Sequence, residues 1–199
     1  MEDVKVAHEP AEETLPDRVR VALEEKGCQV TSAESWADVT KYIGKLAGTS
    51  GSVALAAFPL AEEATLGDRL NAEGLSVLST VACTREEILS ASVGITAADA
   101  VVAETGTIFL VENEGDSRFV SNMPPIHIAL VVKEAMASTV TEGLKKVRRA
   151  SQEKYGVPLA NYVTAISGPS RTADIEFKMA FGMHGPKEVH VILLEGDIY

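Results

Sequence analysis

Cysteine is nearly absent from this sequence, and so are clusters of metal-binding side chains. Only two cysteines occur, Cys28 and Cys83, and neither lies in a Cys-x-x-Cys pair or near a histidine at ligand spacing. The sequence therefore gives no case for a zinc site or an iron–sulfur cluster held by this chain. It also lacks the Gly-x-Gly-x-x-Gly fingerprint of dinucleotide-binding folds, so the sequence does not identify a cofactor.

Aromatic side chains and positive charge are also scarce. Aromatic residues make up 5% of the chain, and 18 Lys and Arg stand against 29 Asp and Glu, for a formal net charge of -11. Such a chain repels phosphate backbones and offers few rings for stacking on bases, so we expect no nucleic-acid partner. One basic run, residues 145–149, falls on an expected helix and is interpreted as a solvated helix face.

Long apolar runs are missing as well. The longest, around residues 53–57 and at residues 126–132, are far shorter than the roughly 20 residues that a membrane-spanning helix needs. The N-terminus is acidic and carries no basic start followed by an apolar segment. We therefore expect no membrane span and a cytoplasmic protein.

The composition is otherwise that of a folded globular protein. Apolar residues make up 46% and charged residues 24% of the 199 residues, which suits one large α/β domain. Residues 1–13 are polar and acidic and are expected to form a flexible tail. Residues 14–199 are expected to form a single domain.

Hydrophobic periodicity predicts alternating helices and strands. Helices are expected from Thr14 to Gly27, after Ser35 as far as Leu46, and over residues 61–72, 84–91 and 141–154. Strands are expected at residues 28–31, 52–58, 75–81, 99–103, 107–111, 126–132, 162–166 and 189–194, with residues 112–116 as a turn and 117–125 as an ordered loop. This alternation predicts a mainly parallel sheet with helices on both faces.

The strands at residues 99–103 and 107–111 are close enough in sequence to form a hairpin that interrupts the parallel winding. Gly106 supplies the positive φ that its tip needs. The tip exposes Glu104, flanked by the hydroxyl groups of Thr105 and Thr107, and a carboxylate there suits a general base if burial raises its pKa. The alternative is a turn chosen for its geometry, with Glu104 solvated. His127, in a later strand, is interpreted as a packing residue.

A second candidate segment begins where Gly168 and Pro169 stop the strand at residues 162–166. Ser170 or Thr172 can cap a helix that starts near residue 173, with Asp174 in its first turn. Arg171 beside that helix N-terminus is a candidate receptor for a carboxylate or a phosphate.

His184 closes this segment with a side chain that can titrate. The competing interpretation leaves the segment without a site. In it, Arg171 pairs with Asp174 or Glu176, and His184 packs in a turn.

Four segments in order carry a family resemblance. They are Ala103-Glu104-Thr105-Gly106-Thr107, residues 124–127, residues 168–176 and Met183-His184-Gly185-Pro186. Together they resemble the lactate utilization protein C family, the LUD domain, over about residues 93–194, whereas the first half resembles it only in pattern. The resemblance implies a Rossmann-like α/β fold of the NagB/RpiA/CoA-transferase class. It also implies a role in oxidising lactate to pyruvate, alongside partner proteins that carry iron–sulfur clusters.

Our leading hypothesis is a subunit that binds a small anionic ligand or a cofactor while its partners carry electrons. The candidate catalytic residues are Glu104 and His184. The candidate ligand-binding residues are Thr105, Gly106, Thr107, Arg118, Gly168, Ser170, Arg171, Thr172 and Asp174. Two alternatives remain: a stand-alone CoA-transferase-like or isomerase-like enzyme with Glu104 as its nucleophile, and a non-catalytic ligand sensor.

Overall fold

The computed structural model describes residues 13–48, 51–80, 83–112, 116–173, 179–181 and 185–196. Its helices are α1 (Leu15–Glu25), α2 (Trp36–Ala47), α3 (Pro59–Glu63), α4 (Leu66–Ala72), α5 (Arg85–Ser90), α6 (Asp116–Asn122) and α7 (Val140–Tyr155), with a 3-10 turn at Lys133–Ala135. Its strands are β1 (Gln29–Ala33), β2 (Ser52–Leu55), β3 (Ser76–Ser79), β4 (Val93–Ala97), β5 (Ala100–Val102), β6 (Thr107–Glu112), β7 (Ile126–Val131), β8 (Met136–Ala137), β9 (Tyr162–Ile166), β10 (Arg171–Ala173), β11 (Met179–Phe181) and β12 (Glu188–Leu194).

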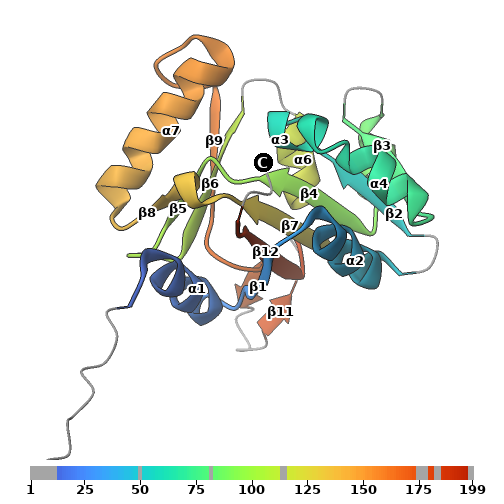
Figure 1. Cartoon of the computed structure of the whole chain (residues 1–199), viewed down its shortest axis with the longest axis horizontal. Coiled ribbons are helices and arrows are strands. Elements are labelled where there is room, and N and C mark those ends of the chain that lie inside the picture. The colour runs from blue at the N-terminus through green and yellow to red at the C-terminus, as the bar shows by residue number, and fades with distance from the viewer. Residues whose placement is uncertain are drawn as a thin grey trace, which may run out of the picture.

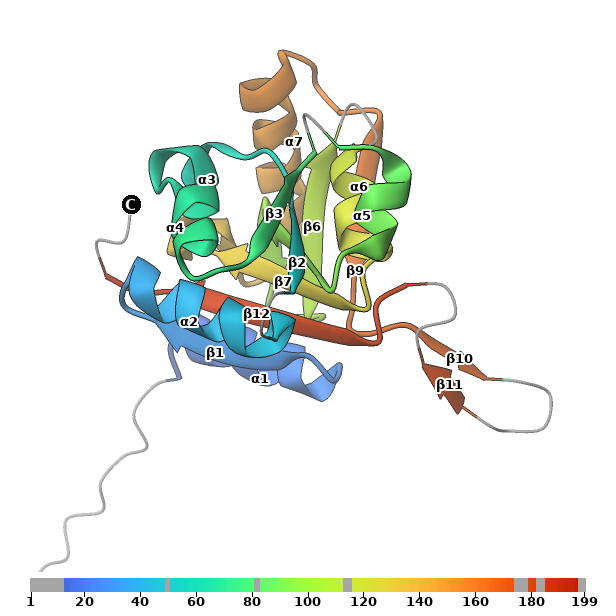
Figure 2. The same cartoon turned by 90° about the vertical axis from the view of Figure 1, so that its right-hand side faces the viewer.

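The larger sheet is parallel throughout and has the order β1-β12-β7-β4-β2-β3. Figure 2 shows α2, α3 and α4 on one side of its strands and α5 and α6 on the other. Central strands such as β7 are apolar at nearly every position, as expected for strands buried on both faces. The predicted class, a mainly parallel sheet with helices on both faces, is confirmed.

A second sheet, of order β8-β5-β6-β9, lies between the larger sheet and α7 (Figure 1). Its inward side chains, including Val101, Ile108 and Leu110, share a core with residues of β7 and β12. Its outward side chains, such as Val111, pack with Val147 of α7. The predicted hairpin is confirmed as β5 and β6, which pair antiparallel. The hairpin belongs to a layer of its own rather than to the parallel sheet.

Local capping chemistry explains where several helices start. Thr14, Thr84 and Thr139 each accept a hydrogen bond from the backbone three residues on, and the side chain at that position bonds back to the threonine N–H. These capping boxes fix the starts of α1, α5 and α7, close to where the sequence predicts them. The predicted helix over residues 61–72 is instead two helices, divided at Thr65, which adopts a left-handed conformation with φ of 49°.

The central strand β4 was not predicted. Its sequence, Val-Gly-Ile-Thr-Ala, contains a glycine and a threonine in place of the large apolar residues typical of a buried strand. The reason lies in packing, because a Cβ atom on Gly94 would lie 2.0 Å from the carbonyl oxygen of Val120 in α6. The close approach of α6 therefore requires glycine. The segment predicted as an ordered loop, residues 117–125, contains most of α6, so that prediction was wrong.

The predicted helix near residue 173 is also wrong. Residues 171–173 form β10, which pairs antiparallel with β11, and this ribbon extends away from the two sheets (Figure 2). Pairing across the ribbon, with Arg171 opposite Phe181, satisfies the backbone groups that a helix would otherwise satisfy.

Two further predictions concern the ends and the surroundings of the chain. Residues 1–12 of the predicted tail lie outside the described residues, and the single-domain interpretation stays a prediction. In the part of the chain that the structure describes, none of the helices has the length and apolar character needed to cross a bilayer.

Candidate functional site

A cleft opens at the carboxyl ends of the parallel strands β2, β4 and β7. In the sheet order, β3 and β4 lie on opposite sides of β2. After β2 the chain continues into α3, whereas after β4 it continues into β5 of the second sheet. Adjacent strands whose connections diverge in this way leave a crevice, where ligands of open α/β sheets commonly bind. Here the cleft lies between the loop at residues 56–59, the end of β4 and the last turn of α7.

The cleft consists of two adjoining chambers that share Phe58, Pro59, Ala97, Asp99 and Lys154. The polar chamber, of about 540 Å³, is lined in addition by residues that include Thr96, Glu112, Glu153 and Tyr155. The apolar chamber, of about 580 Å³, is lined in addition by residues that include Leu60, Ala98, Leu130 and Val132. Both volumes lie in the range usual for small-molecule sites.

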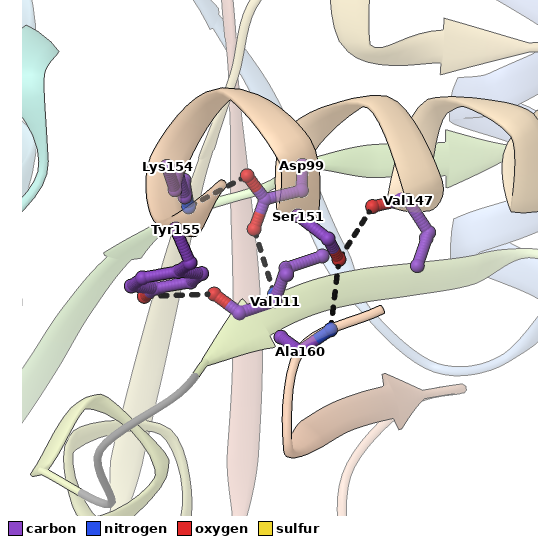
Figure 3. Close-up of polar contacts among 7 residues, drawn as sticks. All are labelled: Asp99, Val111, Val147, Ser151, Lys154, Tyr155 and Ala160. Carbon is purple, nitrogen blue, oxygen red and sulfur yellow. Dashed lines mark hydrogen bonds and ion pairs between the residues drawn. The ribbon is translucent and has the colours of Figure 1, made fainter. Parts of the chain in front are cut away.

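Asp99 and Lys154 form an ion pair at the boundary of the chambers (Figure 3). Lys154 Nζ lies 2.7 Å from Asp99 Oδ1, with the Asp99 side chain 9% and the Lys154 side chain 29% exposed. The other carboxylate oxygen of Asp99 accepts a 2.7 Å hydrogen bond from the backbone N–H of Val111 in β6. Asp99 thus fixes both the corner after β4 and the position of the lysine.

The end of α7 is held by a buried hydroxyl group to the segment that leads into β9. Ser151 donates a 3.0 Å hydrogen bond to the carbonyl oxygen of Val147 and accepts one of 3.1 Å from the N–H of Ala160 (Figure 3). The α7 helix ends at Tyr155, and its C-cap, Gly156, has φ of 68°. These contacts place Lys154 in the last turn of a helix that is anchored near its end.

Thr96 lines the polar chamber and contacts a buried histidine. Its hydroxyl group lies 2.8 Å from Nε2 of His127, which is fully buried. Burial, together with nearby His190, lowers the pKa of His127 to about 3, so the ring is neutral at physiological pH.

The tautomer of His127 follows from its other nitrogen. Within the described structure Nδ1 has no hydrogen-bond partner. We assign the proton to Nε2, because a buried N–H without a partner is rarer and costlier than an unused acceptor. His127 then donates to the hydroxyl oxygen of Thr96, which is 2% exposed.

The structure brings several of the predicted site residues together away from this cleft, at the C-terminal end of α1. Positive φ angles occur at Gly106 (59°) and Gly168 (96°), and a Cβ on either would lie 2.3 Å from a carbonyl oxygen of α1 or its C-cap, those of Ala22 and Lys26. Thr105 donates to the Thr107 hydroxyl group at 2.9 Å, and Thr107 lies 2.8 Å from the Ser167 hydroxyl group. These contacts hold the hairpin tip and the end of β9 against α1.

Arg171 lies at the same end but contacts the C-terminus of a helix, not an N-terminus. Its Nη2 donates a 2.9 Å hydrogen bond to the carbonyl oxygen of Lys26, the C-cap of α1. A cation there is favoured by the negative end of the helix dipole. Because residues 171–173 form a strand, the described residues do not show the predicted arrangement of Arg171 beside the N-terminus of a helix that starts near residue 173.

Glu104 is exposed, and its carboxylate accepts a 2.8 Å hydrogen bond from the N–H of Val140, in the first turn of α7. It therefore satisfies a backbone donor at a helix start. Ser170 donates its backbone N–H to the carbonyl oxygen of Pro186 at 2.9 Å. Neither residue lines the cleft.

Arg118 is separated from the hairpin tip. Its guanidinium group lies 4.7 Å from the ring centroid of Tyr162, which pairs with Glu112 at the far end of β6 from Thr107. Six residues of strand place those ends roughly 17 Å apart at ~3.3 Å per residue. Asp174, His184 and the side chain of Thr172 lie outside the described part of the structure, so their predicted roles, like those of the other residues, stay predictions.

The cleft residues were missed because they come from separate segments that form no motif. One signal was available in the sequence: Asp99 follows a short run that ends a buried strand, and polar residues at carboxyl ends of parallel strands often bind ligands. That signal depended on recognising β4, which its glycine and threonine obscure.

Metal ligands and the thiol of Cys28 also bear on the chemistry that is available. Among the described residues, no group of three or more His, Cys, Asp and Glu side chains is placed to hold a metal ion. Burial raises the pKa of the Cys28 thiol to about 11, although Arg171 nearby opposes this effect. A thiol with so high a pKa is a packing group and not a nucleophile.

Comparison with known proteins agrees with the architecture. The chain is 38% identical over 110 residues to lactate utilization protein C of Exiguobacterium sp., an alignment that covers 55% of this chain and 47% of the relative. It is 36% identical over 111 residues to lactate utilization protein B of Shouchella clausii, and 33% identical over 111 residues to the uncharacterized electron transport protein YkgF of Escherichia coli. Each of these two alignments covers 56% of this chain and 22% of the relative.

The matched region thus spans about half the length of the C protein and less of the other two. A crystal structure of a DUF162 family protein from Deinococcus radiodurans superposes with a TM-score of 0.65 at 22% identity, covering 91% of this chain and 96% of that one. The family model of the LUD domain matches residues 17–194. The chain belongs to the LUD domain family.

Proposed function

We propose that this chain is a cytoplasmic subunit of a bacterial lactate-utilization system, in which it binds an organic ligand and partner proteins carry electrons. The observation that carries the proposal is the LUD match over residues 17–194, together with relatives named lactate utilization protein C and B. A relative named as an electron transport protein supports a redox context. The system would oxidise lactate to pyruvate, and its partners would hold the iron–sulfur clusters.

We place the ligand in the carboxyl-end cleft. This cleft combines a cavity of suitable volume with convergent polar groups, Thr96, Asp99 and Lys154, at a point where strand connections diverge. At the hairpin end, where several predicted residues gather, the Glu104 carboxylate accepts from α7 and Arg171 donates to the C-cap of α1. A ligand role for those residues remains a separate hypothesis.

A stand-alone acyl transferase that uses Glu104 has weaker support. Its carboxylate would need to be free to attack a carbonyl group and form a covalent intermediate. Here it accepts a hydrogen bond from Val140 and lies outside the cleft. The proposal therefore assigns Glu104 to the start of α7 rather than to chemistry.

The test is genetic. We would delete the gene in the bacterium that encodes this chain and compare growth on lactate with growth on pyruvate. The proposal expects the deletion strain to grow on pyruvate but not on lactate. Growth on lactate should recover when the gene is restored. Undiminished growth of the deletion strain on lactate would contradict it. The purified chain alone should not oxidise lactate, whatever electron acceptor is supplied.

A further inference from the structure

We propose that the cleft takes an uncharged aromatic heterocycle, with its ring in the apolar chamber and a carbonyl oxygen or ring nitrogen accepting a hydrogen bond from Lys154. The inference deepens the proposed function and rests on it only for the choice of the cleft as the ligand site. It names a ligand class and a ligand-binding residue that the family name does not supply.

The size of the cleft is the first argument. The two chambers, of about 540 and 580 Å³, adjoin at Asp99 and Lys154. Cavities of this volume typically enclose molecules of drug size. Lactate or pyruvate would fill only a small part of either chamber, so most of the lining would remain in contact with water. A larger ligand that spans the boundary fits the space better.

The walls of the apolar chamber provide the second argument. Phe58, Ala98 and Leu130 lie buried behind its surface. The apolar surface that a ligand can cover comes from Leu60 and Val132, which are half-buried, and from the exposed Pro59. Burying apolar surface of the ligand and of the lining is favourable and does not depend on direction. A flat ring therefore suits this lining better than a polar chain.

The hydrogen-bonding capacity of Lys154 is the third argument. An ammonium group has three N–H donors, and the ion pair with Asp99 engages one direction only. Lys154 lines both chambers, so its remaining donors can reach an acceptor on a ligand that lies across the boundary. Thr96 also lines the polar chamber but is 2% exposed, so Lys154 is the principal donor that this lining offers. The site therefore presents donors to a ligand that brings acceptors.

The charge of the lining decides against an anion. Among the described residues that line the two chambers, Lys154 is the only cation, whereas Asp99, Glu112, Glu134 and Glu153 are acidic. Asp99 already neutralises Lys154, and Arg149, 2.6 Å from Glu153, neutralises that carboxylate. A phosphate or carboxylate would therefore meet no lining cation without a counter-ion among the described residues, whereas an uncharged acceptor can accept the same hydrogen bonds without needing one.

The experiment uses the full-length purified protein and three probes: riboflavin, its phosphate ester FMN, and lactate. Riboflavin supplies a ring with carbonyl acceptors and no charge, and FMN adds a phosphate to the same ring. We expect saturable quenching of riboflavin fluorescence, weaker binding of FMN at low ionic strength, and no displacement of riboflavin by lactate.

Matched variants assign the binding to the cleft. Asp99→Asn/Lys154→Met removes both charges together, so that neither is left buried and unpaired. It should weaken riboflavin binding by about tenfold, the effect of losing one charged hydrogen bond. Leu60→Trp, which narrows the apolar chamber without touching the ion pair, should weaken it as well. Lys145→Met, on α7 but outside the cleft lining, should leave it unchanged.

Three outcomes overturn the inference: no binding of riboflavin, tighter binding of FMN than of riboflavin, or equal binding by the wild type and both cleft variants. These outcomes are separable from those of the growth test. Riboflavin binding without a lactate phenotype would contradict only the proposed function, and a lactate phenotype without riboflavin binding would contradict only this inference.

Discussion

The ammonium group of Lys154 lies 2.7 Å from the carboxylate of Asp99, so that the last turn of α7 is tied to the corner where the chain leaves β4. The same carboxylate accepts the N–H of Val111. One side chain therefore joins the parallel sheet, the second sheet and α7 at the edge of the cleft.

Asp99→Ala should destabilise the protein by about 3 kcal/mol, because it leaves the Val111 N–H without its acceptor and Lys154 without its counter-ion. Asp99→Asn keeps an oxygen for Val111 and should cost roughly 1 kcal/mol. Urea unfolding of the two variants beside the wild type measures both. Equal losses in the two variants would show that the charge, and not the hydrogen bond to Val111, carries the effect.

Stability should fall as the pH is lowered below about 6.5, partly because of His127. Its pKa is about 3 in the folded protein and near 6.5 in the unfolded chain, so between these values only the unfolded chain binds the proton. The histidine then costs about 1.4 kcal/mol of unfolding free energy per pH unit and has no effect above pH 6.5. His127→Gln, which can still bond to Thr96, should remove this part of the slope. Identical pH profiles for wild type and variant would refute the assignment.

Gly106→Ala should be strongly destabilising for two separable reasons. The left-handed conformation costs about 1–2 kcal/mol for alanine, and the new Cβ would lie 2.3 Å from the Ala22 carbonyl oxygen, adding about 1–3 kcal/mol of overpacking. Gly156→Ala is the matched control, since Gly156 has φ of 68° and nothing within 4 Å of a new Cβ. It should show the conformational cost alone in urea unfolding. A loss as large in Gly156→Ala would mean that the contact with α1 adds nothing.

Arg171→Ala separates the cleft from the hairpin end as the place of the ligand. Arg171 contacts Lys26 and lies outside the cleft lining. We expect a loss of stability below about 1 kcal/mol, as for an exposed hydrogen bond, and unchanged riboflavin binding by fluorescence titration. Loss of binding in this variant, with folding intact by circular dichroism, would move the ligand to the hairpin end.

Much of the fold could be predicted from the sequence where local chemistry decides it. The threonine capping boxes of α1 and α5, the apolar run of β7 and the hairpin at Gly106 all carry their own signals. Prediction failed where distant partners decide. The strand β4 carries a glycine at residue 94 because α6 lies against it, and Arg171 is extended because β10 pairs with β11.

The site was harder to predict than the fold. The motif residues Glu104, Gly106 and Gly168 are distinctive in sequence, and in the structure they hold two helix ends in place. Phe58, Asp99 and Lys154 meet only because the strand order brings three carboxyl ends and α7 together. No spacing along the chain encodes that meeting, so a cleft of this kind becomes visible only with the topology.

The most direct test of the whole account joins the cleft to lactate growth. A strain that lacks the chain would receive the wild-type gene, Asp99→Asn/Lys154→Met or Lys145→Met, with cellular protein levels checked by immunoblot and growth on pyruvate as the control. The account predicts growth on lactate with the wild type and Lys145→Met, and none with the double variant at a comparable protein level. Growth on lactate with the double variant at the wild-type rate would contradict it.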